Sequence, residues 1–135
     1  MSGRATRAPA QRRQISSGSP FEGRIGFSRA IVAGKRVLVS GTAPVFPDGQ
    51  CPDDPEAQAK RCLEIIFAAL HEAGAGPEHV VRTRTFLTRA EDWEAVGRAH
   101  GEVFREIRPA STMVVVAALL DPRWRVEIEA EAELP

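Results

Sequence analysis

The chain has 135 residues, 43% of them hydrophobic and 27% charged, and its formal net charge at pH 7 is zero. This length fits one domain with its own core, and no apolar run is long enough to cross a membrane. The N-terminus has no apolar segment after its basic residues, and Cys51 and Cys62 form no cluster, so we expect a cytoplasmic protein with free thiols and no disulfide framework or metal site.

The first 20 residues are basic, with Arg4, Arg7, Arg12 and Arg13 and no acid. Their content of Ser, Gly, Pro and Ala predicts a disordered tail. A nucleic-acid-binding arm is the alternative, but arginines without aromatic partners are a weak footprint for one. We therefore expect a tail over residues 1–20 and a single ordered domain over residues 21–135.

Two strands and a helix are predicted next. Residues 29–33 and 36–43 flank Gly34-Lys35, which is a hairpin signal. A loop rich in Pro, Asp and Gly leads to Asp54-Pro55, where a capping acid and a proline favour the start of a helix. The apolar stripe of this helix runs to Ala73, and Gly74 ends the helix.

A strand and a second helix follow. Residues 80–87 alternate as a strand does. Thr88 and Glu91 have the spacing of a capping box, and Arg108-Pro109 ends the predicted helix. His100 lies on the apolar stripe of this helix, so we expect a core residue with one hydrogen bond rather than a catalyst.

The C-terminal quarter is rich in β-branched residues and predicts two strands joined at Asp121-Pro122. In the second strand, apolar residues alternate with Arg123, Arg125, Glu127 and Glu129, so one face is charged. The order ββ-α-β-α-ββ predicts an α+β two-layer sandwich, a single mixed sheet with both helices on one face.

The uncovered face of this sheet is expected to be too apolar to face water. We therefore predict a closed homo-oligomer that buries it, with polar residues gathered in clefts between subunits. The residues expected on this face are Arg36, Leu38, Ser40, Thr42, Arg82, Arg84, Phe86, Met113, Val115, Ala117, Leu119, Arg125 and Glu127.

Several segments together resemble the YjgF/RidA family, also known as endoribonuclease L-PSP or translation-inhibitor-like proteins. They are Val37–Gly41, Ala73-Gly74, Val80–Leu87, Arg108–Ala110 and Val126–Ala130. The resemblance implies a chorismate-mutase-like fold and a homotrimer, in which the three sheets form a central barrel and ligands bind in three clefts between subunits. It also implies hydrolysis of reactive enamines and imines to 2-oxo acids and ammonia, without a cofactor.

The resemblance also assigns site residues. Ser40 and Gly41 match the family, as does Glu127, its candidate for positioning or activating water. Ser111 stands where the family has the Arg that binds the substrate carboxylate. A single neutral hydrogen bond in place of that pair loses about 1.5–3 kcal/mol, or roughly ten- to a hundredfold in binding.

Two further departures make the implied cleft more apolar. Phe27 replaces a site Tyr, and Met113 replaces a Cys. An ordinary imine deaminase is therefore not expected. Arg84 and Arg125 are predicted to face the same side as Ser111 and Glu127, and either is a candidate to replace the missing Arg.

Two functions stay open at this stage. The first is a cofactor-independent enzyme acting on an imine-like, amide or other carbonyl-derived metabolite, with Glu127 as base and Ser40 binding an oxygen. The second is a non-catalytic trimer that binds or senses a small ligand. Cleavage of RNA, which the family's older name suggests, is disfavoured because acids outnumber bases beyond the tail.

Overall fold

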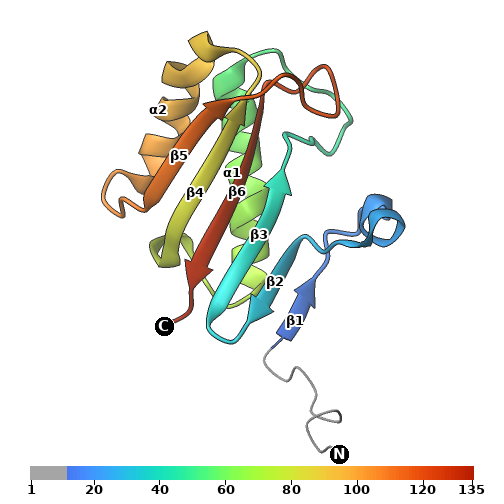
Figure 1. Cartoon of the computed structure of the whole chain (residues 1–135), viewed down its shortest axis with the longest axis vertical. Coiled ribbons are helices and arrows are strands. Elements are labelled where there is room, and N and C mark those ends of the chain that lie inside the picture. The colour runs from blue at the N-terminus through green and yellow to red at the C-terminus, as the bar shows by residue number, and fades with distance from the viewer. Residues whose placement is uncertain (1–11) are drawn as a thin grey trace, which may run out of the picture.

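The protein forms one mixed six-stranded sheet with two helices packed on one face, as the computed structural model of residues 12–135 shows (Figure 1). The predicted α+β sandwich is confirmed. The strand order is β1-β2-β3-β6-β4-β5, in which only β4 and β5 pair in parallel. The strands are β1 (Arg12–Ile15), β2 (Ala30–Ala33), β3 (Arg36–Thr42), β4 (Val80–Leu87), β5 (Ala110–Val115) and β6 (Val126–Glu133).

Helix α1 (Pro55–Glu72) begins and ends where its capping residues predict. The Asp54 side chain accepts a hydrogen bond from the Glu56 N–H at 3.1 Å, and Pro55 is the first helical residue. Gly74, at φ 87°, ends the helix in the left-handed region that glycine adopts easily. The buried side of α1 packs against β3 and β6 and forms the core with them.

Helix α2 (Trp93–Phe104) does not begin with the predicted capping box. A short 3₁₀ turn, η4 (Ala90–Asp92), precedes it, and no side chain among residues 12–135 caps its first N–H groups. The carboxylate of Asp92 is instead bound by Arg125 in a two-pronged pair of 2.7 and 3.0 Å. This pair ties the segment before β6 to the start of α2.

Order begins earlier in the chain than we expected. β1 lies within the segment predicted as a tail, pairs with β2 and contributes Ile15 to the core. A π-helical turn, η2 (Glu22–Gly26), follows, and its Glu22 carboxylate accepts hydrogen bonds from Ser16 and Ser17. These bonds, chiefly the one from Ser17, lower the pKa of Glu22. The tail prediction for residues 1–11 lies outside the described residues.

A β-bulge interrupts the pairing of β3 with β6. Val39 is opposite Ala130 and Thr42 is opposite Ile128, so Ser40 and Gly41 fill a stretch where regular pairing leaves room for one residue. The extra residue reverses the alternation, and Thr42 is fully buried on the helix side. Its predicted place on the uncovered face is therefore wrong.

The register of β5 corrects a second prediction about that face. Ser111 is opposite Thr83 and Met113 is opposite Thr85, and both threonines are buried on the helix side. Met113 and Val115 were expected on the uncovered face, but they also belong to the helix side. Residues 116–125 form no strand, so the two predicted C-terminal strands are shorter than expected. Among the described helices, none has the length and apolar character needed to span a membrane.

Candidate functional site

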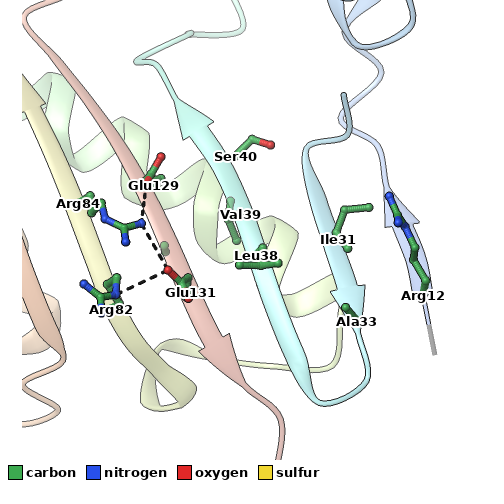
Figure 2. A pocket seen from close by; sticks show the side chains of 11 residues that line it. Arg12, Ile31, Ala33, Leu38, Val39, Ser40, Arg82, Arg84, Glu129 and Glu131 are labelled. Atoms are coloured by element: carbon green, nitrogen blue, oxygen red, sulfur yellow. Dashed lines mark hydrogen bonds and ion pairs between the residues drawn. The ribbon is translucent and has the colours of Figure 1, made fainter. Parts of the chain in front are cut away.

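The uncovered face of the sheet contains a hollow of about 450 Å³ between β1 and β4 (Figure 2). Arg12 and Ile31 line one side, and the arginines of β4 line the other. Ser40 lies at its upper end in the figure, where the bulge begins. The hollow therefore reaches from the charged middle of the sheet to Ser40, a predicted site residue of β3.

Charged side chains on this face are largely paired with one another. Arg84 binds Glu129 at 2.9 Å and Glu131 at 3.4 Å, and Arg82 approaches Glu131 at 3.6 Å (Figure 2). Arg36 also binds Glu131. Arg84 shares the uncovered face with Glu127, as predicted, but its guanidinium is held by other carboxylates. Arg84 therefore forms ion pairs with Glu129 and Glu131 on the surface of the sheet, rather than with Glu127.

Glu127 lies at the bulge, opposite Phe86 of β4. Its carboxylate fits against the backbone of Gly41 so closely that a Cβ added to Gly41 would overlap Oε2 of Glu127. Burial raises the pKa of the Glu127 carboxyl group, and the positive charge of Arg29 opposes this shift in part. A raised pKa brings a carboxylate closer to the range of an effective general base.

Arg29 is a member of this site that the sequence analysis did not identify. It precedes β2, and its Nη2 donates a 2.6 Å hydrogen bond to the carbonyl of Gly41. Its guanidinium also lies 5.9 Å from the centre of the Phe27 ring. Its Nε is buried without a hydrogen-bond partner among the described residues. Burial lowers the pKa of Arg29, while the charges of Glu22 and Glu127 raise it, and an arginine remains a cation under such shifts.

Ser40 and Phe27 complete the cluster at the bulge. The Ser40 hydroxyl donates to the carbonyl of Ser28 at 2.7 Å, and the Ser40 N–H donates to the carbonyl of Arg29 at 3.0 Å. The hydroxyl proton is therefore already engaged, and Ser40 has lone pairs left to accept a bond from a ligand. Phe27 is partly exposed. The predicted residues Phe27, Ser40, Gly41 and Glu127 thus gather around the bulge with Arg29.

Ser111 and Met113 lie elsewhere in the single chain. The Ser111 hydroxyl is 2.8 Å from Oγ1 of Thr83 on the helix side of the sheet, and Met113 packs against the core. Ser111 is level with Thr83 along β4, whereas Glu127 is level with Phe86. Ser111 and Glu127 therefore lie on opposite faces of the same sheet, and one chain does not bring them together.

Arg125 also differs from its predicted orientation. Its Nε and Nη2 bind Asp92, and its Nη1 donates to the carbonyl of Asp53 at 2.7 Å. The expectation that it faces Glu127 is wrong, because the strand begins only at Val126 and the charged alternation does not extend back to Arg125. Within the described part of the chain, no group of three His, Cys, Asp or Glu residues is arranged to hold a metal.

Comparison with known proteins gives consistent matches over nearly the whole chain. The family model for endoribonuclease L-PSP matches residues 19–134. Protein SCO2049 of Streptomyces coelicolor is 43% identical over 121 residues, which cover 89% of this chain and 90% of that protein.

Solved structures agree with these sequence matches. Rv2704 from Mycobacterium tuberculosis, a member of the YjgF/YER057c/UK114 family, has a TM-score of 0.84 and 43% identity over 91% of this chain and 99% of its own. TdcF from E. coli, solved with bound serine, has a TM-score of 0.76 and 27% identity over 91% of this chain and 94% of its own.

Proposed function

The chain belongs to the YjgF/RidA family of endoribonuclease L-PSP proteins, and on this basis we propose that it binds and hydrolyses a small imine-like or other carbonyl-derived metabolite. The observation that carries the proposal is the half-buried Glu127 carboxylate, held against Gly41 near the charge of Arg29. No cofactor is required, because a positioned carboxylate and a water molecule are sufficient for this chemistry.

The proposed assembly is a homotrimer that covers the open face of the sheet. Leu38 and Val114 lie on this face and are 40% and 42% exposed in the single chain. Apolar side chains of this size on an uncovered sheet favour an interface. In such a trimer the ligand clefts lie between subunits, and β5 of one subunit can border the bulge of another. The two free cysteines fit the proposed cytoplasmic location.

In the proposed reaction Glu127 acts as the general base. Water adds to the imine or carbonyl carbon while one of its protons moves to the Glu127 carboxylate. The electron pair of the double bond moves onto the nitrogen or oxygen, which then takes up a proton. Collapse of this adduct releases ammonia or another leaving group. Ser40 accepts a hydrogen bond from the substrate, because its own proton is held by Ser28.

The preferred substrate differs from that of family members with an Arg after Pro-Ala. Ser111 and Phe27 cannot bind a carboxylate as a guanidinium and a phenol do together. We therefore expect a substrate without a carboxylate beside the reacting carbon. The related TdcF was solved with bound serine, which supports a site of the right size for a small metabolite.

The test compares 2-aminoacrylate with a neutral imine, using wild type, Glu127→Gln and Ser111→Arg. We expect hydrolysis of the neutral imine, a loss of roughly a hundredfold or more in Glu127→Gln, and a gain on 2-aminoacrylate in Ser111→Arg. Equal rates for wild type and Glu127→Gln on both compounds would refute the hydrolase proposal.

A non-catalytic trimer that binds or senses a small ligand is the second candidate. It is favoured by Phe27 and Ser111, which stand where the family resemblance implies a Tyr and an Arg. Calorimetry with the same compounds separates the two candidates. Binding that Glu127→Ala weakens, without turnover by wild type, selects the second.

A further inference from the structure

A chain of hydrogen bonds joins three side chains on the helix side of the sheet, away from Glu127. Oγ1 of Thr83 lies 2.8 Å from Nε2 of His100 and 2.8 Å from Oγ of Ser111. Thr83 is fully buried on β4, whereas Ser111 is exposed on the edge strand β5. The series of hydrogen bonds therefore leads from the half-buried imidazole of His100 to the hydroxyl of Ser111 at the surface.

The direction of these bonds depends on which ring nitrogen of His100 carries the proton. A threonine hydroxyl has one proton, so Thr83 donates to one neighbour and accepts from the other. His100 is half-buried on α2 beside the ring of Phe104, 4.6 Å away between centres, and its burial lowers its pKa. With the ring proton on Nδ1, Nε2 of His100 accepts from Thr83, and Thr83 accepts from Ser111.

Thr85, the next threonine on the same face, shows that the fold does not require such a series of hydrogen bonds. Thr85 is also buried, and its Oγ1 has no hydrogen-bond partner among the described residues. Its neighbour on β5 is the apolar Met113. The exposed Ser111 hydroxyl is free to bind water, yet it lies within hydrogen-bond distance of Thr83.

From this arrangement we propose that Ser111 is a nucleophile toward activated carboxylic esters, with His100 as its base acting through Thr83. Oγ of Ser111 forms a bond to the ester carbonyl carbon, and its proton passes to Oγ1 of Thr83. The Thr83 proton moves to Nε2 of His100. The bond from the carbonyl carbon to the alkoxy oxygen then breaks, and the leaving group departs with the electron pair and takes up the proton that His100 releases. Water later hydrolyses the acyl-serine, which restores Ser111 and releases the carboxylic acid.

Within one chain, the relay lies apart from Glu127. The two sites lie on opposite faces of the sheet, and Ser111 is level with Thr83 rather than with Phe86, the neighbour of Glu127. The acylation step uses neither Glu127 nor Arg29.

The experiment treats the full chain with p-nitrophenyl acetate and follows acetylation of each residue by peptide mass spectrometry. Acetylation of Lys35 and Lys60 in the same sample gives an internal reference rate. We expect Ser111 to be acetylated faster than its exposed neighbour Thr112, which lies on the same strand without such a relay. Thr83→Val should lower the Ser111 rate roughly a hundredfold, the lower end of general base catalysis.

Thr83→Ser restores the hydroxyl and should restore the rate, which separates the relay from a general effect on folding. His100→Leu should resemble Thr83→Val, while the lysine reference rates stay the same in all variants. If Ser111 reacts no faster than Thr112, or if both relay variants retain the wild-type Ser111 rate, the proposal is overturned.

Discussion

Gly41 and Glu127 fit together at the β-bulge so closely that a single methyl group on Gly41 would overlap the Glu127 carboxylate. The contact joins β3 to β6, two strands that are far apart in sequence and adjacent in the sheet. The φ of Gly41 is not positive, so its backbone conformation does not require glycine. The close contact with Glu127 explains why glycine occupies this position. The space at the bulge is occupied by the carboxylate of Glu127.

Gly41→Ala should therefore displace the Glu127 carboxylate. Because the overlapping atom is the end of a flexible side chain, we expect a stability loss below the roughly 1–3 kcal/mol typical of overpacking, together with loss of imine hydrolysis. Urea denaturation and turnover measure the two effects. Gly97→Ala is the matched control, since its Cβ meets open space on α2. Unchanged turnover in Gly41→Ala would contradict this account.

The raised pKa of Glu127 predicts a pH-dependent stability difference. Burial disfavours its charged form, so this group stabilises the fold below its usual pKa of 4.5, and the contribution is lost as pH rises through the raised value. Glu127→Gln removes the penalty, so the variant should be more stable than wild type at neutral pH. The difference should vanish at acidic pH. Thermal unfolding across this range tests it, and a constant difference would argue against a buried carboxylate.

Arg29→Gln should change the electrostatic environment of the Glu127 carboxylate. The variant loses the charge that opposes the pKa shift of Glu127, so we expect the pKa of Glu127 to rise further. Titration of the Glu127 side chain by NMR measures the change. Arg24→Gln is a suitable control, because Arg24 lies on the exposed turn η2. An equal Glu127 pKa in Arg29→Gln and wild type would show that Arg29 has no electrostatic role.

Two arginine–carboxylate ion pairs differ in burial, so removing them should lower the free energy of unfolding by different amounts. Arg125 and Asp92 have side chains only 14% and 4% exposed, so Arg125→Ala leaves a buried carboxylate unpaired and should cost about 3 kcal/mol. Arg84 and Glu129 are 42% and 32% exposed, and Arg84→Ala should cost about 1 kcal/mol or less in the single chain. Urea denaturation of both variants checks the difference, and similar losses would mean that burial does not separate the pairs.

The proposed trimer predicts a strong effect of charge on the uncovered face. Leu38→Asp should prevent association, because a buried carboxylate without a partner is unfavourable at an interface. Light scattering after size exclusion gives the mass of wild type and variant. Trp93→Asp is a useful control, since Trp93 is an exposed apolar residue of α2, on the other side of the sheet. A wild-type monomer at micromolar concentration would rule the trimer out.

The sequence was sufficient to predict the fold because its local signals agree with one another. Asp54 and Pro55 fix the start of α1, and the residues predicted for β4 are those observed. The candidate site was harder to predict, because the pairing between strands decides which residues share a face of the sheet. The bulge at Ser40 and Gly41 moved Thr42 to the helix side, and no local pattern marks the insertion of one residue into a strand.

The register of β5 could not be predicted for a similar reason. Its residues are apolar at nearly every position after Thr112, so either face fits the pattern. Arg29 was overlooked because an arginine at the edge of a predicted strand is usually solvent-exposed. Its role depends on the Gly41 carbonyl, which is distant in sequence and close only after β2 and β3 have paired.

Because the bulge lies inside a paired sheet, its groups are held in place before any ligand arrives. The Ser40 N–H and hydroxyl and the Gly41 carbonyl already have hydrogen-bond partners in the chain. A ligand that enters beside Glu127 therefore orders little of the protein, and association loses less conformational entropy than it would at a mobile loop. Affinity at this site should depend mainly on the fit of the ligand, and small molecules that differ by one polar group should be well discriminated.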